Sequence, residues 1–266
     1  DGAGVFGAGL VSAGVLLTAI AAGGVLRDFH PRAAPFALAL LLCAGAGWSG
    51  ALLAQDYAGV FAAMETAWLA QVGLVALSGE RDRGAFNGAL RMLGAGAGAA
   101  ALFLVGAALV SRSVGSTDVI ALANTPVSSP GMAGAGVALM LAALAIKTGV
   151  APLHFWTGAA YGRAGSLPAL TLGAVGAIGA LGLLLRIAAH AMAAPAIGEG
   201  MSAALAALGV ASVVIGSFQA AGATNLRRLA GYASAAQAGC ISVACVQIRY
   251  ECRAPAGVQS SRRRRC

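Results

Sequence analysis

The sequence has few charged residues and only one lysine. Asp, Glu, Lys and Arg make up 10% of the 266 residues, whereas soluble globular chains contain about 25%. This shortage excludes a soluble enzyme and a soluble nucleic-acid-binding protein, although the formal net charge is +8. The five cysteines lack the spacing of zinc ligands or of a secreted disulfide framework, which excludes those two classes as well.

Long apolar stretches without charge take up most of the chain. Seven stretches of at least 20 residues contain no charged residue, and an eighth, residues 57–79, contains only Glu65. A helix of about 20 residues crosses the hydrocarbon core of a bilayer. We therefore expect an all-α polytopic membrane protein with about eight transmembrane helices. Their expected positions are 4–25, 36–55, 57–78, 86–111, 134–160, 167–189, 201–221 and 228–247.

The arginines in the loops predict an orientation. The side reached after the first helix carries seven of them, Arg27, Arg32, Arg81, Arg83, Arg163, Arg227 and Arg228, against Arg112 on the other side. By the positive-inside rule, the first side faces the cytoplasm or the matrix. The polar tail 249–266, with Arg262 to Arg265, breaks this rule if the segment 229–248 crosses the membrane. Either that segment does not cross, or a partner holds the tail.

Two ionisable residues, Glu65 and Lys147, lie inside apolar sequence. A charge at the bilayer centre costs about 2.5–3.5 kcal/mol, so such residues usually face the bundle interior and pair with each other. Lys147 is the only lysine among 17 basic residues, and a buried lysine can release its proton whereas arginine stays charged. The pair is therefore a candidate proton relay. The alternative is an ion pair that only holds two helices together.

A proline after Lys147 predicts a broken helix. Pro152 has no N–H to bond the carbonyl of Thr148, and irregular backbone at membrane depth persists only where it is buried in protein or lines a cavity. We therefore expect the helix 134–160 to break between Lys147 and Pro152. His154 follows the break and is a third candidate for the relay; the alternative is a histidine that caps a helix end at the membrane interface.

These stretches resemble one family. Residues 147–161 read K-T-G-V-A-P-L-H-F-W-T-G-A-A-Y, which is similar to the K-x-x-x-x-P-x-H-x-W-T-P-D-x-Y signature of subunit N, or subunit 2, of respiratory complex I. Three more matches follow the family's order. Residues 61–69 resemble its helix with a buried Glu, residues 87–92 and 115–118 resemble its A-L-K-Y and G-S-x-D-L segments, and residues 224–239 resemble T-N-I-K-R-L-L-A-Y-S-S-I-x-x-x-G.

The resemblance implies an antiporter-like fold and a membrane-arm subunit of the proton-pumping NADH:quinone oxidoreductase. Glu65 and Lys147 fall on the family's half-channel pair. The implied partners are the lipid bilayer and other membrane-arm subunits, but no nucleic acid. This chain would carry no cofactor, metal or redox site; FMN, iron–sulfur clusters and ubiquinone would belong to the parent complex. The expected division is 1–35, a first span and loop; 36–189, an antiporter-like repeat; 190–248, the start of a second repeat; and 249–266, the tail.

The sequence also departs from the family pattern. A second lysine of the family falls on Ala177, its Pro-Asp falls on Gly158-Ala159, and the lysine of A-L-K-Y falls on Arg91. The second repeat is largely missing, so either another chain supplies it or the subunit no longer conducts protons. The alternatives are a subunit of a related cation/proton antiporter or membrane-bound hydrogenase complex, or a purely structural subunit.

The expected location is an energy-converting membrane. We favour the mitochondrial inner membrane over the bacterial plasma membrane, because the chain is shorter than bacterial members of the family and has no initial Met.

Overall fold

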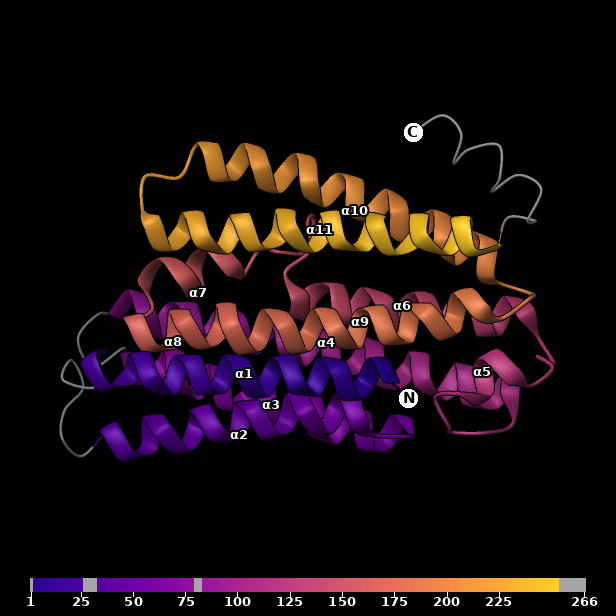
Figure 1. Cartoon of the computed structure of the whole chain (residues 1–266), viewed down its shortest axis with the longest axis horizontal. Helices are drawn as coiled ribbons and strands as arrows, with labels where there is room; N and C mark the ends of the chain where they lie inside the picture. The colour runs from indigo at the N-terminus through magenta and orange to yellow at the C-terminus, as the bar shows by residue number, and fades with distance from the viewer. Residues whose placement is uncertain (1, 26–32, 79–82, 254–266) are drawn as a thin grey trace.

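The computed structural model describes residues 2–25, 33–78 and 83–253, and these residues form a bundle of roughly parallel and antiparallel helices (Figure 1). Eight helical segments are long and apolar enough to cross a membrane. They are α1 (Gly2–Val25), α2 (Ala34–Leu53), α3 (Tyr57–Leu77), α4 (Arg83–Val114), α6 (Pro130–Thr148), the joined α8 (Ser166–Thr171), η3 (Leu172–Gly176) and α9 (Ala177–Ala193), α10 (Gly198–Ala221) and α11 (Leu226–Arg253). The expected all-α membrane fold with eight spans is confirmed.

The helices lie at the expected positions, although α4 and α11 extend beyond the uncharged stretches, and one helix differs more strongly. The helix expected at 134–160 ends at Thr148, and a short helix α7 (Thr157–Arg163) follows after eight residues of loop and turn. The break is therefore confirmed, but the second half of the expected helix is much shorter than predicted. The short helix α5 (Ala121–Asn124) and the π-helical turn η3 were not predicted.

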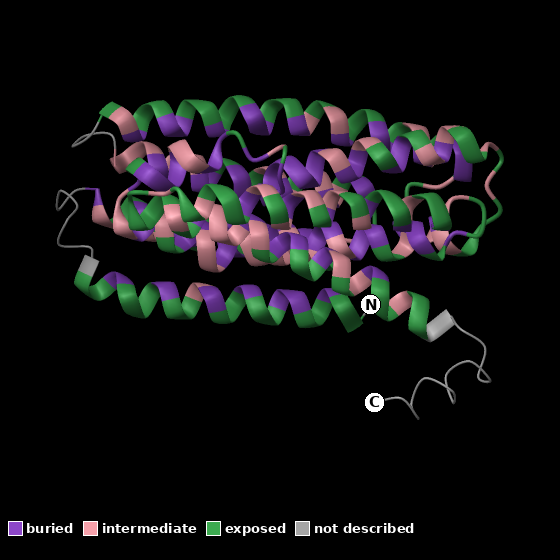
Figure 2. Cartoon of the chain, turned by 90° about the horizontal axis from the view of Figure 1, so that it is seen from above, coloured by how far each residue is buried: buried purple, intermediate pink, exposed green. Residues whose placement is uncertain are grey.

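Burial in the bundle is that of a membrane protein. Large apolar side chains such as Phe6, Phe36 and Phe218 are exposed on outer helix faces, while Trp48 and Phe103 are fully buried. Figure 2 shows the exposed residues along the outer faces and the buried ones between the helices. This pattern suits a lipid surround, because lipid tails solvate apolar side chains as well as the core does.

Helix α4 is the central support of the first part of the bundle, where it packs against α3, α6 and α7. At its crossing with α6, a Cβ on Gly106 would lie 2.5 Å from the carbonyl oxygen of Gly136. Only residues without side chains permit this approach, which is how small residues stabilise helix pairs in membranes. Helices α10 and α11 form a second pair, and α11 also packs on α7.

The arginine-rich side of the sequence corresponds to one end of the bundle. Figure 1 shows α7, the start of α8 and the α10–α11 turn together at this end, and Arg227 donates to the carbonyl oxygen of Ala164 at 2.8 Å there. Helix α11 runs without a break through 229–248, and its length and composition suffice to cross a membrane. Arg27, Arg32, Arg81 and the tail residues Arg262 to Arg265 lie outside the described residues.

Candidate functional site at the break between α6 and α7

Helix α6 ends in a left-handed glycine directly after Lys147 and Thr148. Gly149 has φ +73°, a conformation that glycine adopts without strain. Its N–H donates to the carbonyl oxygen of Ile146, and the N–H of Val150 donates to that of Ala145 at 2.9 Å. This closure satisfies the carbonyl groups at the helix end and fixes Lys147 in the last turn of α6.

The backbone of the break is satisfied by a neighbouring helix. The N–H of Ala151 donates to Oγ of Ser212 on α10 at 3.0 Å, and that hydroxyl donates to the carbonyl oxygen of Ala235 on α11 at 2.8 Å. Ser212 is fully buried. A non-helical segment at membrane depth requires such partners within the protein, so α10 and α11 hold the break in place.

Glu65 and Lys147 meet beside α4. Lys147 Nζ lies 2.9 Å from Glu65 Oε1, with 0% of the lysine side chain and 18% of the glutamate side chain exposed. Neither Nζ nor Oε1 forms a hydrogen bond to any other group among the residues that the structure describes. The lysine is therefore buried, the glutamate is mostly buried, and each depends on the other for charge compensation.

Two tryptophans surround the lysine. The ring centroid of Trp68 lies 4.5 Å from Lys147 Nζ, a distance at which the face of the ring attracts the ammonium group. Trp156 packs edge-to-face on Trp68, with the centroids 5.0 Å apart. Both indoles are fixed by hydrogen bonds from Nε1, that of Trp68 to the carbonyl oxygen of Met92 and that of Trp156 to the carbonyl oxygen of Ile146.

His154 lies in the loop of the break and faces different helices. Its Nε2 is hydrogen-bonded to Oε1 of Gln219 on α10, and its ring packs edge-to-face against Tyr232 on α11. Its side chain is buried, and Nδ1 has no hydrogen-bond partner in the described part of the chain. The structure thus brings Glu65 and Lys147 together, whereas the contacts of the imidazole go to α10 and α11.

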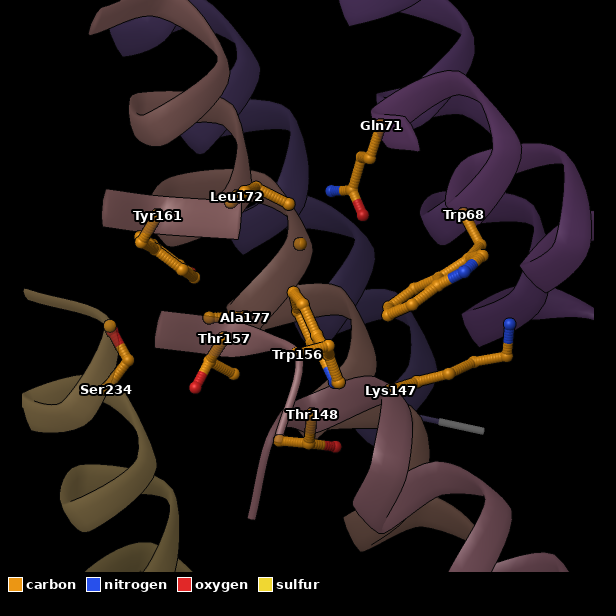
Figure 3. Close-up of a pocket in the computed structure, with 12 residues that line it drawn as sticks. Trp68, Gln71, Lys147, Thr148, Trp156, Thr157, Tyr161, Leu172, Ala177 and Ser234 are labelled. Atoms are coloured by element: carbon orange, nitrogen blue, oxygen red, sulfur yellow. The ribbon is translucent and has the colours of Figure 1, made fainter. Parts of the chain in front are cut away.

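A small cavity lies next to the lysine, between α3, α6, α7, η3 and α11. Figure 3 shows Gln71, Thr148, Trp156 and Ala177 around it. Gln71 is 1% exposed. Ala177, at the position of the family's second lysine, also lines this cavity.

The sequence interpretation did not identify Ser212, Gln219, Trp68 or Gln71 as parts of the site. Ser212 and Gln219 lie in the uncharged stretch 200–226, and Gln71 lies in 57–79. The only sequence feature that could have identified them is a polar side chain in an apolar stretch. It is weak, because most serines in membrane helices bond only to their own backbone, as Ser202 does here.

Comparison with known proteins identifies the family. Residues 54–253 match the model of the transmembrane family described as NADH:quinone oxidoreductase/Mrp antiporter. The chain belongs to this family. The resemblance to subunit N is also confirmed: the chain is 30% identical over 213 residues to NADH-quinone oxidoreductase subunit N of Rubrobacter xylanophilus, and 30% identical over 250 residues to subunit N 1 of Sorangium cellulosum.

These alignments cover 79% and 86% of this chain but 44% and 47% of the two relatives. The chain therefore spans about half the length of the curated relatives it matches.

Solved structures agree with the family assignment. A chain of respiratory complex I from Thermus thermophilus matches with a TM-score of 0.76 and 28% identity, covering 92% of this chain and 51% of that one. A chain of the Mrp complex from Dietzia sp. matches with a TM-score of 0.73 and 24% identity, covering 92% of this chain and 44% of that one. Because its identity is only 24%, the match to the Mrp complex supports the fold and not a shared function.

Proposed function

We propose that the chain is a membrane-arm subunit of a proton-pumping NADH:quinone oxidoreductase and contributes a proton half-channel through Glu65 and Lys147. The observation that carries this proposal is the 2.9 Å distance between the two charged groups at the broken helix. The relatives named NADH-quinone oxidoreductase subunit N support the choice of complex. The alternative role for the pair is a structural ion pair.

The chemistry of the pair supports proton transfer. The carboxylate stabilises the ammonium form of Lys147 in a site that offers it no hydrogen bond from any other described group. When a proton neutralises Glu65, this stabilisation disappears and burial favours the uncharged amine. Lys147 then gives its proton to the next carrier.

His154 is the proposed next carrier on the side of α10 and α11. Its imidazole is buried, and Nδ1 has no hydrogen-bond partner among the described residues. An imidazole can accept a proton on one ring nitrogen and donate one from the other, as a relay group must. Gln219 holds the ring through Nε2.

The proposed setting is the plasma membrane of a bacterium, with other membrane-arm subunits as partners. The named relatives are bacterial, which supports this membrane over the mitochondrial inner membrane. FMN, iron–sulfur clusters and the quinone site would belong to the partner subunits. The proposed division of the chain remains an antiporter-like repeat at 36–189 followed by the start of a second repeat at 190–248.

The test is proton uptake by vesicles that contain the whole complex with this chain. Lys147→Ala removes the titrating group, so we expect NADH-driven proton uptake and coupled quinone reduction to fall together. Arg112→Ala is the matched control, because Arg112 is an exposed charge near the end of α4 and should leave both rates unchanged. Native proton uptake by the Lys147→Ala complex would exclude the proposed half-channel.

A further inference from the structure

Arg186 of α9 is a buried charge that the proposed half-channel does not use. It is 4% exposed, although it lies in the candidate membrane span Ser166–Ala193. Its Nη1 donates to the carbonyl oxygen of Ala54 at 2.8 Å and lies 3.5 Å from that of Ala51. Ionisable residues inside membrane spans are costly and usually mark a functional site.

Arg186 lies near the outer end of the bundle, which is the end opposite the arginine-rich one. Ala54 ends α2 there, and Figure 1 shows α5 at the same end. The turn between α2 and α3 pairs with the loop between α4 and α5 through an antiparallel bridge of Asp56 and Asp118. Asp118 is exposed, and its charge acts on the buried guanidinium. The guanidinium thus lies where α9 meets the end of α2 and the paired loops.

Apolar packing separates Arg186 from the cavity beside the ion pair. Arg186 follows the cavity residue Ala177 by nine residues, which is about 14 Å of helix. Trp48 and Leu52 of α2 pack against α9 in this interval, and each is at most 1% exposed. A Cβ on Gly179 would lie 2.4 Å from the Trp48 side chain, so the two helices are in direct contact. No side chain of α9 in this interval is ionisable.

Apolar packing also separates Glu65 from the outer end of α3. Tyr57 and Val60, in the first turn of this helix, are at most 4% exposed. Phe61, one turn before Glu65, stacks on Phe103 of α4 with the ring centroids 6.2 Å apart. Closely packed apolar side chains leave few voids large enough for water. A proton from the outer side therefore has no continuous path of polar groups to the carboxylate.

We propose that Arg186 is the outer electrostatic seal of the half-channel: its fixed positive charge repels protons that enter from the outer side before they reach Glu65. This inference rests on the proposed function. Arginine stays protonated in proteins, so it cannot pass a proton onward as Lys147 does. Fixed arginine charges form electrostatic barriers to protons and cations in membrane pores.

The groups around Arg186 stabilise the guanidinium without removing its charge. The carbonyl groups at the end of α2 form the negative end of a helix dipole, but they carry no net charge. Asp118 is ionised but exposed, so water and salt screen its charge more strongly than that of the buried arginine. His190, one turn further along α9, adds positive charge when it is protonated. A proton that passes Asp118 therefore still meets a net repulsion at the guanidinium.

The test is the passive proton leak of vesicles that contain the whole complex, measured without NADH as the decay of an imposed pH gradient. Arg186→Gln keeps N–H donors for the carbonyl oxygen of Ala54 but removes the charge. We expect its leak to rise by about tenfold or more, the effect of a unit charge about 4 Å from the proton near a protein surface. Arg186→Lys keeps the charge and should leak at the native rate. Arg112→Ala, the matched control, removes an exposed positive charge from the same end and should also leave the leak unchanged.

Two results of this comparison would overturn the seal. One is a native leak in Arg186→Gln. The other is an equal rise in Arg186→Gln and Arg186→Lys, because packing and not charge would then close this end of the bundle.

A combined variant tests whether the leak runs through the half-channel. Adding Glu65→Leu and Lys147→Met to Arg186→Gln removes both carriers and should return the leak to the native rate. A leak that persists would contradict the proposal, because the route would bypass the pair. Native NADH-driven proton uptake by Lys147→Ala would instead refute the proposed function itself, and this result is separate from a leak measured without NADH.

A cryo-EM structure of the native complex, at a resolution that shows ordered waters, tests the seal without any substitution. We expect no continuous file of waters between Arg186 and Glu65. Such a file would overturn the proposal, because it would give protons a route past the guanidinium to the carboxylate.

Discussion

At the scale of single residues, the site depends on the mutual compensation of two charges. Lys147 is completely buried and Glu65 mostly so, and neither has another hydrogen-bond partner among the described residues. Removing one member of such a pair leaves an uncompensated charge, whereas replacing both with apolar residues of similar size is often neutral. Stability and proton transfer therefore respond differently to the same substitutions.

This difference predicts a rescue. We expect Lys147→Met to lower the stability of the subunit by about 3–5 kcal/mol, because Glu65 is left without its counter-charge. Adding Glu65→Leu should restore most of that loss without restoring proton uptake. Thermal unfolding of the purified complex, followed alongside uptake, measures both effects. Additive losses of stability in the double variant would contradict the ion-pair account.

Gln219 is expected to set the protonation pattern of His154. Its Oε1 is hydrogen-bonded to Nε2 of the imidazole. In the tautomer that suits this contact, Nε2 donates its hydrogen to Oε1 and Nδ1 is the proton acceptor. Gln219→Leu should slow proton uptake by about tenfold and shift its pH profile, because the imidazole can then adopt either tautomer.

Gln247→Leu is the matched control, since Gln247 is exposed on α11. An unchanged rate and pH profile in Gln219→Leu would exclude His154 from the relay in the form proposed here.

At the scale of elements, the break between α6 and α7 is held by hydrogen bonds to α10 and α11. Ser212→Ala removes the acceptor of the Ala151 N–H, and an unsatisfied buried donor costs about 1–3 kcal/mol. We expect a loss of stability of that size in thermal unfolding. Ser217→Ala changes an exposed serine of the same helix and should be neutral; equal effects of the two variants would show that the Ser212 contact is unimportant.

The elements that the sequence predicts well are those determined by local properties. Uncharged stretches locate the eight spans, and Pro152 locates the break. The short length of α7 and the π-helical turn at Leu172–Gly176 are not local properties. They depend on tertiary packing, that of α7 against α4 and α11 and that of the turn against α1, α2 and α3. Hydropathy carries no information about such packing.

The same distinction applies to the site. Glu65 and Lys147 can be identified from the sequence alone, because each is a charged residue next to or within an apolar stretch. Gln71, Ser212 and Gln219 carry no charge, and their importance comes from partners about 60 or more residues away, such as His154 for Gln219, or from a cavity. Such pairings follow from helix packing and could not be inferred from spacing alone.

At the scale of the whole molecule, the distribution of arginines predicts an orientation in the membrane. Thr224 is exposed in the α10–α11 turn, at the end that carries Arg163, Arg227 and Arg228, and Thr125 is exposed near α5 at the other end. In a cysteine-free background, we expect a membrane-impermeant maleimide to label Thr224→Cys only from the cytoplasmic side and Thr125→Cys only from the opposite side. The reverse labelling pattern would contradict the orientation.

The most direct test of proton transfer through Glu65 and Lys147 is the rate of NADH-driven proton uptake by the complex carrying Lys147→Arg. Arginine keeps the positive charge opposite Glu65 and so preserves assembly, but it does not release its proton in proteins. We predict a fully assembled complex whose proton uptake through this subunit is lost. Proton uptake at the native rate would show that the pair does not titrate during turnover and that Glu65 and Lys147 serve only to hold their helices together.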